Sequence, residues 1–472
     1  MPEARENNEV RHWLIAVILL GIVVRFVGLT QESFWNDEAF SGYAAQFSSL
    51  KEVLALAAAD VHPPGHLIFG WLWAQVFGAS DFSLRCTSAI GGTLLIPTVF
   101  ALGRRFYDER TALVGATLMT FLTQTIYYSQ EFRAYIFVGL LSAISVLLLY
   151  DIFKGVGRLW QFAALAATLI ANAYLHYFGL LFSVLIGFLF IAIAARTKRH
   201  IFPSTATAII AMIAYVPWLP EMAKAPNILS HPVAPGLREI GLLSNVVFGP
   251  GWILVGLAGA LLVAGFWCSR TNEKESVPIR QDLWLLAWIL IPLAISIIVS
   301  YVKVPVYTPR NLFLAITPAV LLMARAICGF RPELRRTMAI TVGFLVLHQG
   351  IQLSTKGHFI RPQKQELREA TQYILARMSP ADAVEVVGWD YLNVGYYLRQ
   401  SNRGDAVHIT PLEPGKRTGV PVGNGPWLFY AGLEVPPRNE IERRFEILEE
   451  MHFREATVLK VRRRNAEHDD VP

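Results

Sequence analysis

Side chains that can move protons or hold anions recur along the apolar first three quarters of the chain. Asp37 and Glu38 form an acidic pair, and His62 precedes two prolines. The later members of this set are Tyr128, Glu131, Arg133, His176, Lys303, Tyr307 and Arg310. Carboxylates serve as general bases, and Arg and Lys bind phosphate or carboxylate oxygens. These residue types are those of a catalytic cavity, if the chain brings them to one place.

Most of these residues also have a purely structural explanation. Asp37 and Glu38 could cap the following helix. His62 and His66 are four apart, as two metal ligands on a helix are, but a proline-started helix explains them as well. Glu131 and Arg133 could form an interfacial charge pair. His176 could be a hydrogen-bonded interfacial residue, and Arg310 could be a snorkelling anchor. Their shared side of a membrane, derived below, is therefore the stronger indication.

Composition indicates which elements must position these residues. Of 472 residues, 54% are hydrophobic and only 17% are charged, whereas a soluble protein has about 25% charged residues. Residues 354–472 hold 17 Lys and Arg and 17 Asp and Glu. The net charge of +6 thus lies among apolar runs, which argues against nucleic-acid binding. Three cysteines in or beside apolar runs form no disulfide or zinc pattern.

The apolar runs predict an α-helical polytopic membrane protein with about eleven transmembrane helices. The first run lacks a small-residue cleavage site and is expected to be a retained signal anchor. A shorter run after His62 is predicted to lie in the outer interface, within an outer loop at 30–84. The predicted spans are 12–29, 85–103, 111–127, 134–153, 159–175, 178–195, 203–218, 244–268, 282–301, 310–327 and 337–353.

The short loops predict the orientation of the chain. With the N-terminus in the cytoplasm, every cytoplasmic loop is rich in Lys and Arg, as positively charged loops should be. The acids and histidines then share the outer face. An odd number of spans places the C-terminal part outside the cytoplasmic membrane.

Residues 354–472 are predicted to form a small extracytoplasmic α/β domain that follows a membrane domain at 1–353. Its role is left open between acceptor recognition, covering of the site and passive stabilisation. Helices are expected near 363–377, 391–400 and 439–449, and strands at 384–388, 406–410, 427–430 and 456–461.

The order of the motifs resembles that of bacterial membrane glycosyltransferases with the GT-C fold, in the protein mannosyltransferase and aminoarabinose transferase group. The similarity covers residues 12–353, and Asn311 departs from the aromatic residue that usually follows the last arginine. The motifs are Asn36-Asp37-Glu38-Ala39, His62-Pro63-Pro64, Tyr127-Tyr128-Ser129-Gln130-Glu131-Phe132-Arg133, His176-Tyr177-Phe178-Gly179 and Pro309-Arg310-Asn311-Leu312.

The resemblance implies a glycosyltransferase with a polyprenyl-phosphate-linked sugar donor. It implies Asp37 as the catalytic base beside Glu38, with Glu131 completing the site. Arg310, Lys303 and Arg133 are the candidate donor-phosphate ligands, and His62, Tyr128, His176 and Tyr307 the candidate substrate contacts. Some relatives hold a divalent metal ion, which leaves His62 and His176 open as metal ligands. The acceptor is left open between a glycolipid, a polysaccharide and a protein.

The chemistry expected is transfer with inversion, by analogy with inverting glycosidases. No Gly-rich phosphate loop is present, so a soluble nucleotide is not required. The proline-broken loop at 219–243 is a candidate lid. A lipid-linked sugar flippase or other transporter is the main competing function, although transporters usually show internal repeats and broken spans. A non-catalytic scaffold is a weaker one, because it gives no reason for acids on one side.

Overall fold

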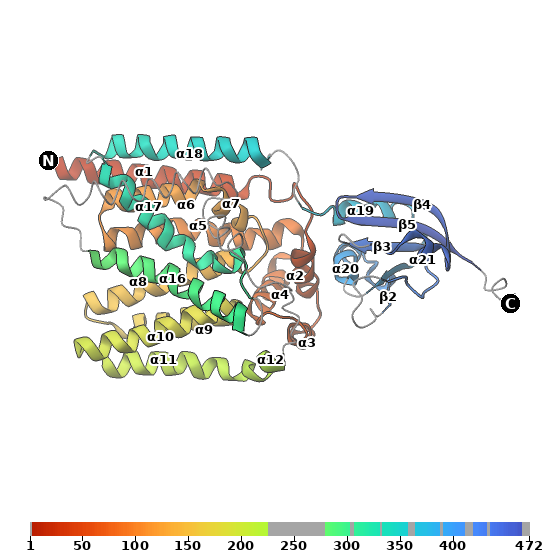
Figure 1. Ribbon diagram of the computed structural model, residues 1–472, viewed down its shortest axis with the longest axis horizontal. Helices are drawn as coiled ribbons and strands as arrows, with labels where there is room; N and C mark the ends of the chain where they lie inside the picture. Colours follow the sequence, from red (N-terminus) through yellow and green to blue (C-terminus); the bar gives the residue numbers. More distant parts are fainter. Residues whose placement is uncertain are drawn as a thin grey trace. The chain divides into compact units, whose positions relative to one another are not determined.

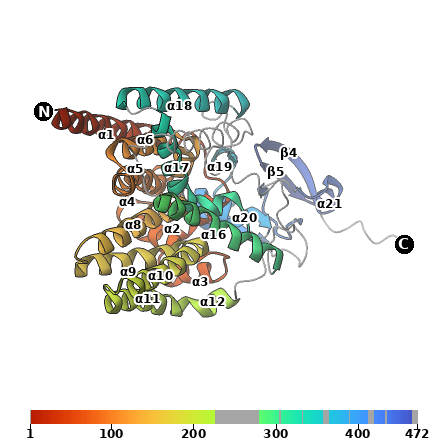
Figure 2. The ribbon, with the colours of Figure 1, turned by 60° about the vertical axis from the view of Figure 1, so that its left-hand side comes forward.

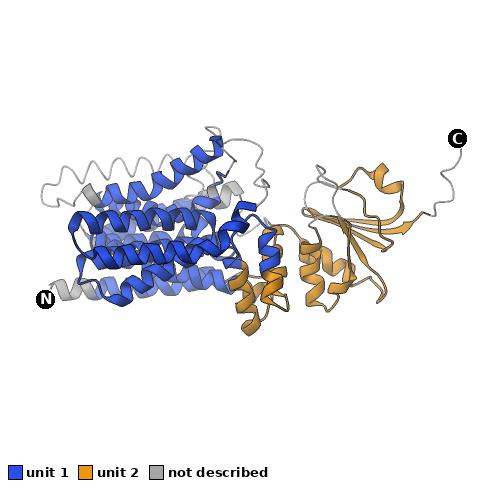
Figure 3. Cartoon of the chain, turned by 90° about the horizontal axis from the view of Figure 1, so that it is seen from below, with its two compact units in different colours: residues 1–27, 54–66, 85–361 blue, residues 28–53, 67–84, 362–472 orange. Residues whose placement is uncertain are grey.

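The computed structural model describes residues 2–224, 279–302, 306–330, 333–356, 364–387, 390–410, 419–431 and 435–464. The chain divides into two compact units (Figure 3). Unit 1 comprises Met1–Val27, Leu54–His66 and Arg85–Arg361, and unit 2 comprises Gly28–Val53, Leu67–Leu84 and Pro362–Pro472.

Unit 1 is built from long apolar helices that run side by side (Figures 1 and 2). Within it α9 packs on α8, α10 and α11, while α6 packs on α1 and α17. The helices are α1 (Pro2–Phe26), α5 (Asp81–Phe106), α6 (Glu109–Phe121), α7 (Thr123–Ser129), α8 (Tyr135–Lys154), α9 (Leu159–Leu175), α10 (Tyr177–Thr197), α11 (Ile201–Tyr215), η1 (Val216–Trp218), α12 (Leu219–Lys224), α16 (Ile279–Val302), η2 (Pro309–Ala315), α17 (Ile316–Phe330) and α18 (Leu334–Lys356).

Six helices among the described residues are long and apolar enough to cross a bilayer, and α9 is a shorter apolar helix. The six coincide with the spans predicted near 85–103, 134–153, 178–195, 203–218, 282–301 and 310–327. The predicted span at 244–268 and most of the predicted lid lie outside the described residues. The described part of the chain is thus that of a multi-pass membrane protein.

The run predicted as one span at 111–127 differs, because it breaks into α6 and α7. Leu122 has an extended backbone and ends α6. The Thr125 hydroxyl lies 2.7 Å from the carbonyl oxygens of both Met119 and Leu122 and so compensates the broken helix.

Three short helices lie in the predicted outer loop: α2 (Asn36–Ala45), α3 (Leu50–Ala58) and α4 (Gly65–Phe77). α4 begins directly after Pro63 and Pro64, as predicted for a proline-started helix. It has 13 residues, and a span requires about 20. The structure therefore agrees with the interpretation of this run as too short to be a span.

Unit 2 contains a five-stranded sheet in the order β2-β1-β3-β5-β4. β1 pairs in parallel with β2 and β3, whereas β5 is antiparallel to β3 and β4. The elements are α19 (Leu367–Leu375), β1 (Val384–Val387), α20 (Asp390–Gln400), η3 (Gly404–Ala406), β2 (Val407–Thr410), β3 (Trp427–Ala431), α21 (Arg438–Glu442), β4 (Phe445–Phe453) and β5 (Ala456–Arg463). A small α/β sheet in the C-terminal part agrees with the sequence-based expectation.

The helix predicted at 439–449 is wrong over most of its length. α21 ends at Glu442, and Phe445–Phe453 forms β4. β4 pairs with β5 through a tight turn at which Glu455 has a φ of +54°. Phe445 is buried in the core of the sheet. Pairing with β5 therefore overrides the local helical pattern, a common outcome for short amphipathic runs.

Unit 2 also includes much of the predicted outer loop. α2 packs on α20, and the ring of Phe34 stacks on that of Tyr396 at 5.0 Å. The Tyr396 and Tyr397 hydroxyls donate hydrogen bonds of 2.9 and 3.1 Å to the buried Asp81 carboxylate. Segments far apart in sequence thus form one packed body.

Candidate active site

The bend between α7 and α8 buries two charged side chains inside the apolar unit 1. Glu131 is 1% exposed and Arg133 is 8% exposed. The Gln130 amide anchors the bend by donating hydrogen bonds to the carbonyls of Val24 (3.1 Å) and Val27 (2.8 Å) at the end of α1. Burying such charges is costly unless other groups compensate them. The bend is therefore built to hold a carboxylate and a guanidinium in an apolar setting.

His176 joins α9 to α10 and lies near enough to Arg133 for the charge of that side chain to act on its ring. Its extended backbone ends α9, and its Nδ1 atom accepts a hydrogen bond of 3.1 Å from the Phe178 amide. A neutral imidazole therefore carries its proton on Nε2. Among the described residues no atom hydrogen-bonds His176 Nε2 or the buried Tyr135 hydroxyl, and the two rings lie 5.6 Å apart. Two polar groups in contact thus remain available to a ligand.

His62 lies beside His176, with ring centroids 5.5 Å apart. Its Nδ1 atom is 3.1 Å from the Asp60 carboxylate. This placement depends on Gly65, since a Cβ atom there would lie 2.5 Å from the Tyr174 carbonyl oxygen. The start of α4 can approach the end of α9 so closely only without a side chain.

The segment before α17 adds Arg310 to the same region. The ring of Tyr128 contacts Phe313 at 4.7 Å, and the charge of Arg310 acts on Tyr128. Asn311, which departs from the family pattern, holds the Val306 carbonyl through its amide at 3.1 Å.

Two other predicted site residues, Tyr307 and Lys303, are close to Arg310 in sequence, and the structure describes only Tyr307. Tyr307 is buried, and its backbone amide donates to the Ser300 hydroxyl at 2.9 Å. Lys303 lies outside the described residues.

Burial and charge set the protonation of the histidine pair and its neighbour. Burial lowers the pKa of His176 well below its usual value, and the charges of His62, Arg133 and Arg310 act in the same direction. Burial alone would raise the pKa of Asp60, but the hydrogen bond and charge of His62, the Val61 amide and the charge of Arg133 together outweigh it, and the pKa is lowered. His176 is therefore a neutral donor, and Asp60 an ionised acceptor.

Unit 2 contains the predicted acidic pair at the start of α2. Asp37 and Glu38 occupy its first turn, and Asp37 is half-buried. Glu38 is fully buried and forms an ion pair of 2.9 Å with Lys364. The predictions that Asp37 and Glu38 are catalytic, and that Asp37 and Glu131 share one pocket, stay predictions.

The structure adds three residues that the sequence did not single out. Asp60 supports His62, Tyr135 lies beside His176, and Lys364 pairs with Glu38. Asp60 lies only two residues before His62, so spacing could have found it. Lys364 follows Glu38 by more than 300 residues and belongs to no motif. No local sequence signal could therefore have identified it.

The described residues contain no group of three or more His, Cys, Asp or Glu side chains placed to hold a metal ion. His62 and His176 form a pair, and the His62 Nδ1 atom is already engaged with Asp60. The metal role of His62 and His176 stays a prediction, and no catalytic step is assigned to a metal below.

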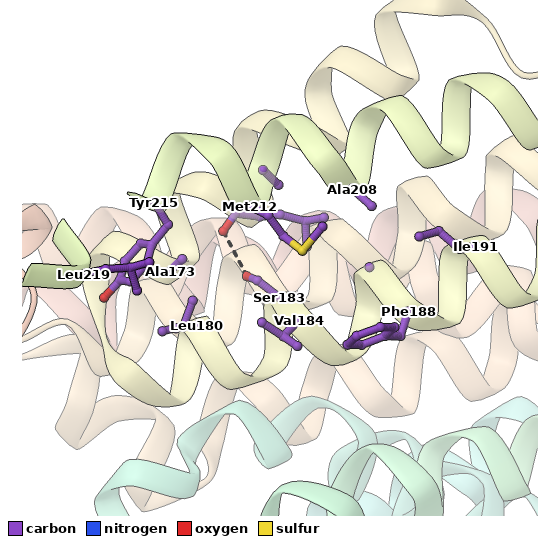
Figure 4. Close-up of a pocket in the computed structure, with 13 residues that line it drawn as sticks. Ala173, Leu180, Ser183, Val184, Phe188, Ile191, Ala208, Met212, Tyr215 and Leu219 are labelled. Carbon is purple, nitrogen blue, oxygen red and sulfur yellow. Dashed lines mark hydrogen bonds between the residues drawn. The ribbon is translucent and has the colours of Figure 1, made fainter. Parts of the chain in front are cut away.

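An apolar groove of about 280 Å³ runs along α9, α10 and α11 (Figure 4). It begins at Ala173 and Leu180, close in sequence to His176, and extends to Ile191 on α10. Its few polar groups include the Ser183 hydroxyl, which donates to the Leu169 carbonyl at 2.9 Å. The groove therefore offers a continuous apolar surface along these three helices.

A family model for dolichyl-phosphate-mannose-protein mannosyltransferases matches residues 61–220. This range contains His62, Glu131, Arg133 and His176. None of the curated proteins is significantly similar to the chain in sequence.

Solved structures show the fold over nearly the whole chain. ArnT from Cupriavidus metallidurans, bound to undecaprenyl phosphate, is 12% identical with a TM-score of 0.59, covering 95% of this chain and 98% of that chain. The oligosaccharyltransferase AglB from Archaeoglobus fulgidus, in complex with an inhibitory peptide and a dolichol-phosphate, is 13% identical with a TM-score of 0.50, covering 85% and 64%. The predicted resemblance to GT-C membrane glycosyltransferases is thereby confirmed, and the chain has their fold.

Proposed function

We propose that this protein is a membrane glycosyltransferase. It transfers a sugar from a polyprenyl-phosphate carrier to an acceptor on the outer face of the cytoplasmic membrane. The observation that carries the proposal is the set of buried residues Glu131, Arg133 and His176, which lies inside the segment matched by the mannosyltransferase family model. The rings of Tyr128 and Tyr135 link the three: Arg133 lies 5.9 Å from the Tyr135 ring, which is 5.6 Å from His176, and the charge of Glu131 acts on Tyr128, 5.5 Å from Tyr135. Structurally similar proteins bound to undecaprenyl phosphate and dolichol-phosphate support the class of donor.

The proposed reaction is a single displacement at the anomeric carbon. The acceptor oxygen forms the new glycosidic bond while the bond from that carbon to the phosphate oxygen breaks. Asp37 takes the proton of the acceptor hydroxyl. The bonding pair leaves with the polyprenyl phosphate, whose added negative charge Arg310 and Arg133 stabilise. Attack opposite the leaving group inverts the anomeric configuration.

The remaining residues have supporting roles in the proposal. The His176 Nε2–H and the Tyr135 hydroxyl are donors for sugar or phosphate oxygens. The apolar groove along α9–α11 takes the start of the isoprenoid tail, because it is lined by apolar side chains and two of them, Ala173 and Leu180, are close in sequence to His176. The proposal requires that Asp37 meet this cluster on the outer face.

The test uses purified protein and undecaprenyl phosphate carrying a labelled sugar, with mannose, glucose and aminoarabinose tried in turn. A detergent extract of the cell envelope supplies acceptors. Wild-type protein should form a labelled product of inverted configuration, and Asp37→Asn should lower turnover by about 10³-fold while folding and membrane insertion are retained. Full turnover by Asp37→Asn would exclude its role as base. Movement of the intact labelled lipid across liposomes, without transfer, would indicate a flippase instead.

A further inference from the structure

Glu38 and Lys364 form a buried ion pair at the start of α2. Lys364 Nζ lies 2.9 Å from a Glu38 carboxylate oxygen, and the two side chains are 8% (Lys364) and 0% (Glu38) exposed. Removing one partner of such a pair leaves an uncompensated buried charge. Glu38 directly follows Asp37 in the first helical turn. Fixing Glu38 therefore fixes the rotation of this turn about its axis, and with it the direction in which Asp37 points.

The residues next to Lys364 hold the approach to α2 as well. The Gln365 side-chain oxygen accepts a hydrogen bond of 2.8 Å from the Asn36 amide, the first residue of α2. The Leu367 amide donates to the Ser33 hydroxyl at 3.1 Å. Segment 364–367 thus binds both the side chain of the first turn and the backbone that enters it.

The same segment is anchored on its other side to the sheet. The Glu366 amide donates to the Arg454 carbonyl at 3.0 Å, and the Arg454 amide donates to the Glu366 carboxylate at 2.9 Å. The Arg454 guanidinium also donates to the Lys364 carbonyl at 3.2 Å. Arg454 lies in the turn between β4 and β5. Segment 364–367 therefore connects the sheet hairpin to α2.

We propose that Lys364 is a positioning residue that orients Asp37 through Glu38, and that the C-terminal sheet serves to hold this arrangement. The proposal rests on the proposed function, in which Asp37 is the base. It gives the C-terminal part a role in presenting the base, and it assigns Glu38 to positioning, without contact to the substrate.

The test compares Lys364→Met with Lys364→Arg, and with Arg377→Met as a matched control that removes an exposed cation from unit 2. Lys364→Met should lower kcat by about 10²-fold, the effect of a small misplacement of a catalytic group, with the donor KM changed by less than about twofold. Lys364→Arg should recover most of the activity, and Arg377→Met should match wild type. All rates are taken per folded molecule, measured by size-exclusion chromatography in detergent.

Hydrogen exchange on the same variants gives a readout that does not depend on activity. In Lys364→Met the amides of α2 should exchange faster, while those of β3 should be unchanged. Unchanged α2 exchange in this variant would overturn the proposal. A wild-type kcat per folded molecule in Lys364→Met would overturn it too, because the pair would then serve stability alone. If wild-type protein transfers no sugar, the proposed function fails, and α2 exchange still decides whether Lys364 positions this helix.

Discussion

In His176 one ring nitrogen has a structural role, while the other can still bind a ligand. Its Nδ1 atom caps α10, which fixes the ring, and its Nε2 atom is buried with no hydrogen-bond partner among the described residues. Gly179 allows α10 to begin this close to α9, because a Cβ atom there would lie 2.1 Å from the Asn172 carbonyl oxygen. A ring held in this way loses less side-chain entropy when it donates its hydrogen bond to a ligand.

Arg310 is predicted to bind the donor phosphate. Arg310→Ala should weaken binding of undecaprenyl phosphate by about 10- to 100-fold, the contribution of a charged hydrogen bond, and should change acceptor affinity much less. Titration of the purified protein with undecaprenyl phosphate measures the first quantity, and the acceptor KM the second. Arg336→Ala, which removes an exposed arginine, is the control. Equal losses for donor and acceptor would count against a phosphate contact.

The stability of unit 2 is predicted to depend on pH because the Asp390 carboxyl has a shifted pKa. Burial raises the pKa of Asp390 to about 7, against an opposing hydrogen bond from the Ala431 amide. Between about pH 4 and pH 7 the folded state therefore binds more protons than the unfolded state, and the free energy of unfolding falls as pH rises, by up to about 4 kcal/mol. Asp390→Asn should raise the Tm of unit 2 at pH 8 and have little effect at pH 4.

The control for this prediction is Asp405→Asn, at an exposed position of the same unit. Tm is measured for the full-length protein in detergent at both pH values. A stabilisation of Asp390→Asn that is the same at pH 4 and pH 8 would show that the carboxyl does not titrate in this range.

Single residues also show what local sequence can and cannot reveal. The motifs predicted Glu131, Arg133 and His176 as site residues, and the structure buries all three in unit 1. Ion pairs between residues far apart in sequence, such as Lys364 and Glu38, were not predicted, because no repeating sequence pattern marks them.

At the scale of elements, the groove along α9–α11 is predicted to select the length of the donor lipid. Met212 lines the groove, and the neighbouring Ile213 is exposed but does not line it. Met212→Trp should raise the KM for a long polyprenyl donor by about tenfold through lost apolar contact, with little effect on a donor with a short tail. Ile213→Trp should behave as wild type. Equal effects of Met212→Trp on both donors would place the tail elsewhere.

The elements differ in how well a pattern predicts them. A run of about 20 apolar residues in a bilayer must satisfy its own backbone hydrogen bonds, which a helix does. Six of the predicted spans are accordingly long helices in the structure. The short run at 439–449 fitted a helix, yet its residues pair with β5. The break in the helix at Leu122 was also not predicted. The Thr125 hydroxyl compensates it by bonding the Met119 and Leu122 carbonyls, and hydropathy does not reveal such a hydrogen bond.

For the whole molecule, the charge pattern predicts how the chain crosses the membrane. Single cysteines are placed at two exposed positions of a cysteine-free variant, Val156→Cys between α8 and α9 and Ser401→Cys after α20. On intact spheroplasts a membrane-impermeant maleimide should label Ser401→Cys, and should label Val156→Cys only after permeabilisation. Labelling of both cysteines without permeabilisation, or the reverse pattern, would contradict the predicted orientation.

The discontinuous make-up of unit 2 has a consequence for engineering. A hybrid that exchanges only the last 110 or so residues with a homologue would separate Lys364 from Glu38 and Asp81 from the two tyrosines that bind it. Grafts that also carry residues 28–53 and 67–84 keep these partners together. The natural module for recombination is therefore three stretches of chain inherited jointly, rather than one terminal block.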